Sequence, residues 1–252
     1  MSILVEYNEA LTKDFIADGT ITLWQPRQGY RVGIDSVLLA ASTKIKPKSH
    51  VLDLGCGVGA IALCLLNREP SISVLGLENN SNLVTLANQN ASENNFSDQF
   101  KIITGSALCL PKDISVGKFD LVISNPPYMP AGTSIPSPNP DKKAAHIEDE
   151  SGLKKWIETA ARALKSKGFL SMIHRADRLS DLLINLEGKF GEITIHPLWP
   201  KVGLSAKRVI LKARKDSSTP LRLQAGTIIH ELDGTYTPLV DAALKGAILN
   251  TG

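Results

Sequence analysis

The amino-acid sequence predicts an α/β fold with a central, mostly parallel seven-stranded sheet, helices on both faces and one late antiparallel strand. Apolar runs typical of buried strands alternate with helix-like segments between residues 51 and 186, which is the pattern of a parallel sheet covered on both faces. A glycine-rich loop joins the first strand to its helix, as in doubly wound folds. Two strand-like runs close the series, and a reversed late strand is common in such sheets.

The expected strands are short apolar runs, and the expected helices show helical spacing of apolar residues. Ser81 is a candidate N-cap of the second helix, and Gly168 is a candidate C-cap of the third. The strands are predicted at 51–54, 72–77, 100–104, 119–124, 169–174, 192–196 and 207–212, and the helices at 60–67, 81–93, 153–164 and 179–186.

The two ends of the chain lie outside this alternation. We expect a hairpin of Thr20–Trp24 and Tyr30–Val32, a short helix from Ser36, and a second hairpin around Asp233-Gly234, a pair that favours tight turns. The chain is therefore divided into a preface packing over the ligand site, a core, and an extension of the same domain, at residues 1–45, 46–215 and 216–252.

The segment 129–152 contains four prolines and no periodicity. An irregular segment of this length is a lid, a binding loop or disordered. It begins directly after Tyr128, which favours a functional role. His146 and Glu148 lie in it, and a solvent-exposed position is the favoured interpretation of both.

Composition excludes several classes of protein. The chain has 252 residues, of which 43% are hydrophobic and 21% charged, as in ordinary soluble domains. No apolar run reaches the ~18–20 residues that span a bilayer, and no signal peptide is recognisable. Three cysteines without metal-ligand spacing indicate reduced thiols. We therefore expect a cytoplasmic protein with no metal, no membrane contact and no obligate protein partner.

The net charge of +3 is unevenly distributed along the chain. Residues 201–222 contain seven Lys and Arg residues and one acid, Asp216. Such a segment produces a positive field that attracts phosphate. The alternative, a solvated strand end and loop, stays open on charge alone.

A glycine cluster follows the first predicted strand. Asp53 precedes the run Gly55-Cys56-Gly57-Val58-Gly59, and Glu78 ends the next strand about 20 residues later. Glycines allow a sharp turn and a close approach to a ligand, and an acid placed like Glu78 accepts ribose hydroxyls. The spacing is not that of a dinucleotide or P-loop site. The Asp53 carboxylate favours a cationic ligand with a ribose, as in S-adenosylmethionine.

A second motif, Asn125-Pro126-Pro127-Tyr128, ends the fourth strand, because two prolines cannot continue a central strand. It presents an amide, bare carbonyls and an aromatic ring. We assign the catalytic site to these four residues, with the Asn125 side-chain oxygen and the Pro126 carbonyl as acceptors for the two hydrogens of a planar amino group. Tyr128 would stack on the base that carries it, and Asn125 also borders the cofactor.

Together, the two motifs resemble class I S-adenosylmethionine-dependent methyltransferases that act on amino groups. More narrowly, the chain is similar to the bacterial tRNA N6-adenine methyltransferases that modify the anticodon-loop adenine of a valine tRNA. The broad resemblance covers about residues 30–213, and the narrower matches are 30–39, Ile173-His174-Arg175 and Ala206–Val209. It implies a Rossmann-like methyltransferase fold, S-adenosylmethionine as cofactor and RNA, expected to be tRNA, as partner.

The resemblance also implies further site residues. Relatives often carry Thr at the position of Ile34, which leaves Asp35 as the cofactor-binding candidate there. The predicted cofactor set is Asp35, Asp53, Gly55, Cys56, Gly57, Gly59, Glu78, Asn79, Ser106, Ala107 and Asn125. The predicted substrate set is Tyr128, Arg175, Lys207 and Arg208; an ion pair is the alternative for Arg175, and Lys207 and Arg208 should point to opposite faces of their strand.

The resulting hypothesis is N6-methylation of an adenine in structured RNA. Alternatives are methylation of a protein glutamine amide or of guanine N2, since each presents an amino group that Asn125 could grip. A non-catalytic RNA-binding relative is a further alternative, which the intact Asn125 and glycine loop disfavour.

Overall fold

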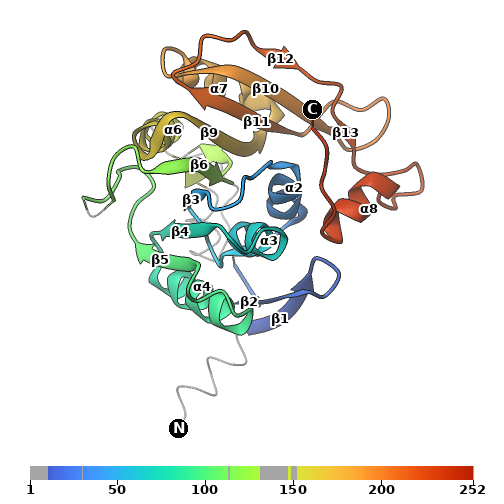
Figure 1. The fold of residues 1–252 in the computed structure, drawn as a ribbon. Coiled ribbons are helices and arrows are strands. Elements are labelled where there is room, and N and C mark those ends of the chain that lie inside the picture. The colour runs from blue at the N-terminus through green and yellow to red at the C-terminus, as the bar shows by residue number, and fades with distance from the viewer. Residues whose placement is uncertain (1–10, 30, 113, 131–146, 149–151, 252) are drawn as a thin grey trace.

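The described chain forms one large sheet with helices on both faces (Figure 1). The structure, a computed structural model, describes residues 11–29, 31–112, 114–130, 147–148 and 152–251. The predicted preface residues 1–10, Tyr30 and most of the 129–152 segment, including His146, lie outside the described residues. Two short strands, β7 (Met129–Pro130) and β8 (Ile147–Glu148), pair in parallel at the ends of that segment.

The sheet confirms the predicted fold class. Within the described ranges, its order is β12-β10-β11-β9-β6-β3-β4-β5, with β13 also paired to β10. β11 is antiparallel to both β10 and β9, whereas β9, β6, β3, β4 and β5 pair in parallel. The seven longer strands are β3 (His50–Leu54), β4 (Ser73–Glu78), β5 (Phe100–Thr104), β6 (Phe119–Ser124), β9 (Leu164–Arg175), β10 (Phe190–Trp199) and β11 (Arg208–Lys215), and the two-residue strands are β12 (Arg222–Leu223) and β13 (Thr227–Ile228).

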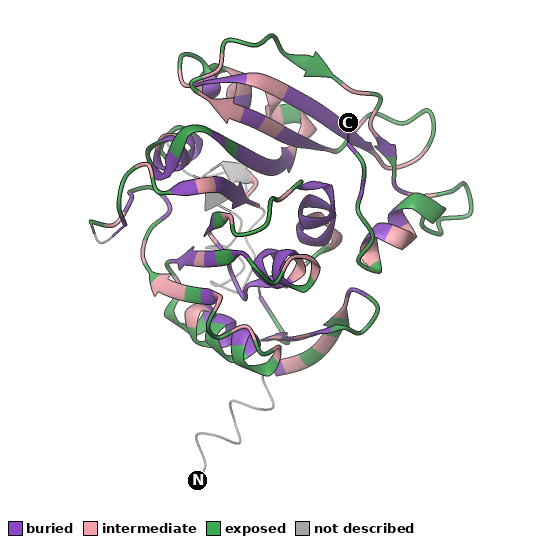
Figure 2. Ribbon diagram, in the orientation of Figure 1, coloured by how far each residue is buried: buried purple, intermediate pink, exposed green. Residues whose placement is uncertain are grey.

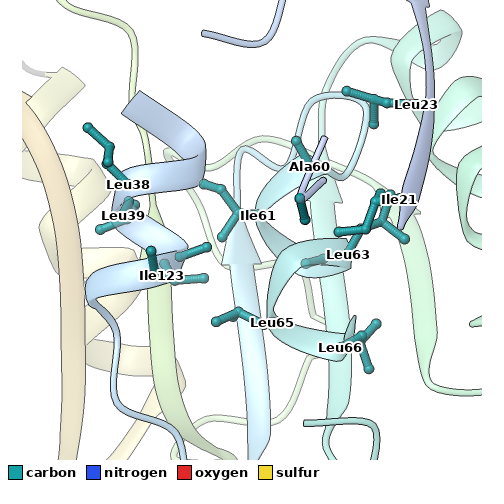
Figure 3. Close-up of a cluster of buried hydrophobic side chains, with 14 of the residues drawn as sticks. Ile21, Leu23, Leu38, Leu39, Ala60, Ile61, Leu63, Leu65, Leu66 and Ile123 are labelled. Atoms are coloured by element: carbon teal, nitrogen blue, oxygen red, sulfur yellow. The ribbon is translucent and has the colours of Figure 1, made fainter. Parts of the chain in front are cut away.

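Helices cover both faces because side chains alternate along each strand. On β3, Val51 packs into a cluster with α3, whereas Leu52 and Leu54 pack into a second cluster with α6 and α7. Figure 3 shows side chains of α3 meeting α2 on one side and β2 on the other. Figure 2 shows the central strands largely buried. The helices are α2 (Ile34–Ser42), α3 (Ala60–Arg68), α4 (Ser81–Glu93), α6 (Gly152–Ala163), α7 (Leu179–Leu186) and α8 (Pro238–Leu244), with the 3-10 turn η1 (Ala176–Arg178) before α7.

Two predicted helix caps were wrong, although the predicted bounds 81–93 of α4 are correct. The N-cap of α4 is Asn80, whose side chain accepts hydrogen bonds from the amides of Asn82 and Leu83, so Ser81 is the first helical residue. Helix α6 ends at Ala163, and Gly168 lies inside β9. Gly168 still has a packing reason to be glycine, since a Cβ there would lie 3.0 Å from the Lys165 carbonyl oxygen.

The N-terminal hairpin was predicted with one correct strand, since Thr20–Trp24 overlaps β2, and one wrong partner, Tyr30–Val32. It consists of β1 (Leu11–Ile16) and β2 (Ile21–Pro26), paired antiparallel. Asn90 on α4 and Asn94 at its C-cap make hydrogen bonds to the outer edge of β2, where a neighbouring strand would otherwise pair. Asn90 accepts from the Trp24 amide and donates to the Trp24 carbonyl at 2.7 and 2.9 Å, and Asn94 pairs with Thr22 in the same way. Asn90 also donates to the Val58 carbonyl, which ties the hairpin to the glycine loop.

The C-terminal extension packs against α2. The predicted turn at Asp233-Gly234 is present, with an isolated antiparallel bridge between His230 and Tyr236, but the following helix α8 was not predicted. The Leu249 amide donates to the Ala41 carbonyl at 3.0 Å, and the Leu249 side chain is fully buried. The start of α2 faces the candidate site. The extension packs against the other end of α2 and so helps to hold this helix in place.

Candidate functional site

Four neighbouring strand ends meet at one edge of the sheet. Strands β5, β4, β3 and β6 lie side by side in parallel, so their carboxyl ends share that edge, where doubly wound folds bind ligands. The residues at or just after these strand ends are the ones singled out in the sequence: Ser106, Glu78, Gly55 and Asn125. The fold therefore brings the two motifs together.

The glycine loop requires glycine for conformation and for packing. Gly55, Gly57 and Gly59 have φ angles of +76°, +55° and +87°, in the region that side chains rarely adopt. A Cβ on Gly55 would lie 2.8 Å from the Trp156 ring, and one on Gly59 would lie 2.6 Å from the Phe100 ring. The loop thus packs tightly against α6 and β5 while its backbone faces the site.

Glu78 connects the glycine loop to the end of β4. Its Oε2 accepts a hydrogen bond from the Gly57 amide at 3.0 Å, and its Oε1 accepts one from the Asn80 amide at 2.9 Å. The residue is 8% exposed. Each carboxylate oxygen has more than one lone pair, so the group can hold the loop and still accept from ribose hydroxyls.

Asp53 lies near the end of β3, next to the glycine loop. Its side chain is fully buried, on the face of β3 that packs against α3. Neither carboxylate oxygen makes a hydrogen bond of normal geometry, although the Ala62 backbone is close enough to lower its pKa. Burial dominates and, together with the charge of Glu78, raises the pKa of Asp53 to about 7. The carboxyl therefore gains or loses its proton near neutral pH.

The remaining predicted cofactor residues differ in exposure. Asn79 and Ser106 are exposed, whereas Ala107 is buried. The Ser106 hydroxyl accepts from the Leu108 amide at 3.2 Å, which shapes the turn after β5. Cys56 is buried, and burial with the charges of Asp53 and Glu78 raises the pKa of its thiol well above the usual value. Cys56 is thus a neutral packing residue.

The Asn-Pro-Pro-Tyr motif ends β6 as predicted, since the strand stops at Ser124. The Ser124 hydroxyl donates to the Leu54 carbonyl at 2.6 Å and accepts from the Trp156 indole at 2.8 Å. These bonds fix the end of β6 against the end of β3. Among the described residues, no hydrogen bond to the Pro126 carbonyl is recorded, which leaves it available to a ligand.

Asn125 and Tyr128 belong to a network with the start of α2. Asn125 donates from Nδ2 to the Ser36 hydroxyl at 3.1 Å, and its Oδ1 is in short contact with the Tyr128 hydroxyl. That hydroxyl also lies 2.9 Å from Oδ2 of Asp35. Arg208 donates from Nε to the same Asp35 oxygen at 2.8 Å, and its guanidinium carbon lies 4.5 Å from the Tyr128 ring centre.

His174 borders this network from β9. Its ring contacts the Tyr128 ring edge-to-face, with centroids 5.5 Å apart. Burial and the nearby Arg178 lower the pKa of His174 to about 4. The imidazole is therefore neutral at physiological pH and packs as an aromatic ring against Tyr128.

The three predicted substrate cations have different environments. Arg175 forms an ion pair with Asp177, which is the alternative considered for it. Lys207 is exposed, and Arg208 turns inward to Asp35. The two adjacent cations thus separate, although Lys207 lies just before β11 and not on the strand as predicted.

The basic segment 201–222 does not form one surface. Lys212 donates to the Ser42 carbonyl at the end of α2, and burial lowers its pKa to about 8. Lys215 donates to the Leu164 carbonyl at the opposite end of β11 from Arg208. An eight-residue strand is roughly 25 Å long. Basic residues that are close in the sequence are therefore far apart in the structure.

Three residues of the site were not assigned by sequence reasoning: Ser36, Trp156 and His174. Trp156 packs against the glycine loop at Gly55. The sequence signal that could have identified Ser36 is its position next to Asp35 at the start of a predicted helix. Within the described ranges, no group of three His, Cys, Asp or Glu residues could hold a metal ion. None of the described helices is long and apolar enough to cross a bilayer.

The comparison with known proteins identifies the family. The model of the methyltransferase small domain matches residues 30–196. The chain belongs to this family. Membership makes it an S-adenosylmethionine-dependent methyltransferase, as the glycine loop predicted.

Individual relatives agree with this assignment. The chain is 37% identical over 158 residues to the tRNA1(Val) (adenine(37)-N6)-methyltransferase of Porphyromonas gingivalis, covering 60% of this chain and 61% of that protein. It is 30% identical over 223 residues to the enzyme of the same name from Actinobacillus pleuropneumoniae, covering 87% and 91%. A predicted O-methyltransferase from Agrobacterium tumefaciens superimposes with a TM-score of 0.70 at 25% identity, covering 84% and 96%.

The residues at the sheet edge fit the family's cofactor. The positive-φ glycine loop presents backbone to the site, Glu78 can accept from ribose hydroxyls, and the buried carboxyl of Asp53 lacks a hydrogen bond of normal geometry. A cationic ligand would favour the ionised form of Asp53. These groups would hold S-adenosylmethionine, which would supply the methyl group at this edge of the sheet.

Proposed function

We propose that this methyltransferase transfers a methyl group to N6 of an adenine in structured RNA, with tRNA in the cytoplasm as the substrate. The observation that carries the proposal is the placement of Asn125, Pro126 and Tyr128 at the sheet edge beside the glycine loop. The printed names of the Porphyromonas and Actinobacillus relatives support adenine N6 in a valine tRNA as the target.

The chemistry follows from the acceptors on the motif. Bound S-adenosylmethionine supplies a methyl group that is already activated by its sulfonium. The Asn125 side-chain oxygen and the Pro126 carbonyl accept the two hydrogens of the amino group, which aims the nitrogen lone pair and stabilises the positive charge that develops on it. Tyr128 stacks on the extruded base, a contact worth about 1–3 kcal/mol. No general base is needed before transfer, because the proton can leave afterwards.

The substrate surface rests on the cations at the site edge. Lys207 is exposed beside Arg208, so it is available to a phosphate of the RNA. The Arg175–Asp177 ion pair lies opposite Arg208 in the sheet register, and Arg175 would have to exchange Asp177 for a phosphate. Lys207 is therefore the stronger candidate for direct RNA contact.

A methyl-transfer assay tests the proposal. The full-length protein is incubated with labelled S-adenosylmethionine and, separately, with tRNA, rRNA and release-factor protein, and labelled nucleosides are analysed by mass spectrometry. N6-methyladenosine in the tRNA is the expected product. Label in guanosine or only in protein would overturn the proposal in favour of guanine N2 or a glutamine amide.

The division of roles has its own test. Asn125→Ala should abolish turnover while calorimetry still detects cofactor binding, because the amide binds chiefly the amino group of the substrate and not the cofactor. Tyr128→Ala should raise the KM for RNA more than the Kd for cofactor. Equal loss of turnover and cofactor binding in Asn125→Ala would contradict this assignment.

A further inference from the structure

The Tyr128 hydroxyl lies between two hydrogen-bond acceptors, and it can donate its one hydrogen to either of them. Asn125 Oδ1 and Asp35 Oδ2 both contact the hydroxyl oxygen. A hydroxyl group has a single hydrogen to donate, so only one of the two acceptors receives a full hydrogen bond at a time. The position of this proton therefore affects the oxygen on which the proposed chemistry depends.

Asn125 Oδ1 is the proposed acceptor for the target amino group. When Tyr128 donates to it, the hydroxyl occupies part of the space and one lone pair of that oxygen. When Tyr128 donates to Asp35, no hydrogen lies between the hydroxyl oxygen and Oδ1, so the two oxygens repel each other. The hydroxyl then moves off Oδ1 toward Asp35 and leaves that oxygen to the incoming amino group. Asn125 Nδ2 remains bound to Ser36 in both cases, so the amide keeps its orientation.

Asp35 is well placed to hold the proton of Tyr128. It lies in the first turn of α2, where the helix dipole favours a negative charge. Arg208 donates to the same carboxylate oxygen at 2.8 Å, and both side chains are largely enclosed, at 20% exposed for Asp35 and 32% for Arg208. The ion pair keeps a charged acceptor beside the tyrosine, and a charged acceptor binds a hydroxyl more strongly than a neutral amide does.

Arg208 also contacts the ring of Tyr128. Its guanidinium lies over the ring, with 4.5 Å between its carbon and the ring centre. An arginine in this position stabilises the ring through a cation–π contact. It covers one face of Tyr128.

We propose that Asp35 and Arg208 are positioning residues that draw the Tyr128 hydroxyl away from Asn125, so that the Asn125 oxygen is available to the amino group of the substrate. In this proposal Asp35 acts beside the binding place of the substrate amino group, instead of contacting the cofactor. The kinetic part of the proposal rests on the proposed function, whereas the contact between Asp35 and Tyr128 does not.

Three variants test the proposal as a mutant cycle: Asp35→Ala, Tyr128→Phe and the double variant. Asp35→Ala forces the hydroxyl onto Asn125 and should lower kcat on tRNA by about tenfold or more, the effect of one hydrogen bond, with little change in cofactor Kd. Tyr128→Phe keeps the ring but removes the competing hydroxyl. The double variant should therefore recover to the level of Tyr128→Phe.

The controls separate this role from a merely structural one. Asp241→Ala removes an acid from the first turn of another helix, α8, and should leave kcat unchanged. Asp35→Asn keeps the shape and a neutral acceptor, and should fall between wild type and Asp35→Ala. A double variant as impaired as Asp35→Ala would overturn the proposal, as would a cofactor Kd that rises in parallel with the loss of kcat.

A spectroscopic measurement does not depend on the substrate. The chain has four tyrosines, and NMR of 13C-labelled tyrosine follows each ring during a pH titration, with Tyr128→Phe assigning its signal. Burial and Asp35 raise the pKa of Tyr128, so Asp35→Ala should shift its titration to lower pH. An unshifted titration would contradict the contact, while failure of wild type to methylate any RNA would overturn only the proposed function.

Discussion

Arg208 places its guanidinium over the ring of Tyr128, 4.5 Å from the ring centre, although 80 residues separate them in the chain. Its neighbour Lys207 is exposed. Two adjacent positive charges therefore have different environments, one inside the proposed acceptor site and one on the surface. This difference makes them a matched pair for experiment.

Arg208→Ala and Lys207→Ala each remove one positive charge but should have different kinetic effects. Arg208→Ala should mainly lower kcat, because the Tyr128 ring and Asp35 lose their partner. Lys207→Ala should mainly raise the KM for tRNA and reduce its salt dependence, as expected for a phosphate contact. Steady-state kinetics at two salt concentrations measure both effects. Indistinguishable changes in kcat and KM would show that Arg208 contributes only charge.

Asp53→Asn should change how stability depends on pH. The pKa of Asp53 is about 7 in the folded protein, against an ordinary value of 3.8. Between these values the folded state binds more protons at this site than the unfolded chain, so this carboxyl lowers stability as pH rises. Relative to wild type, Asp53→Asn should gain roughly 2–3 kcal/mol between pH 5 and pH 7. Urea unfolding of both proteins without cofactor measures this difference, and parallel pH profiles would refute it.

Gly59→Ala should destabilise the protein more than an alanine at an equally strained but open position. Gly59 has φ +87° and no room for a Cβ beside Phe100, whereas Gly234 has φ +94° and no atom within 4 Å of its Cβ position. Both substitutions cost about 1–2 kcal/mol in backbone strain, and Gly59→Ala adds roughly 1–3 kcal/mol of overpacking. Thermal melting compares them. Equal melting temperatures would mean that the loop can move away from Phe100.

Asn90→Ala should loosen the N-terminal hairpin. Its side chain makes hydrogen bonds to the Trp24 amide, the Trp24 carbonyl and the Val58 carbonyl, and each group left unpaired costs about 1–3 kcal/mol. Asn88 on the same helix is exposed and bonds only within the helix, to the Val84 carbonyl. Asn88→Ala is therefore the control. Hydrogen exchange at the Trp24 amide should accelerate only in Asn90→Ala, and equal rates in the two variants would contradict the prediction.

Several elements were predictable because local signals agree with the tertiary structure. β5 and β6 have the predicted bounds, and the helix predicted at 179–186 is α7. These segments are buried on one or both faces, so their apolar pattern reports their packing directly. One strand of the N-terminal hairpin was misplaced. The outer edge of β2 pairs with the side chains of Asn90 and Asn94, a pairing that leaves no pattern in the sequence of the hairpin itself.

The sequence by itself determined the parallel sheet, the glycine loop and the proline-ended strand, because strand patterning and the backbone limits of glycine and proline are local properties. Only the tertiary structure decided how the cations and acids near the site are used. Asp35, Tyr128 and Arg208 come from three distant segments, and they meet because β11 runs antiparallel beside β9. Charge and hydrogen bonding act through space, so their partners depend on the folded arrangement of the strands.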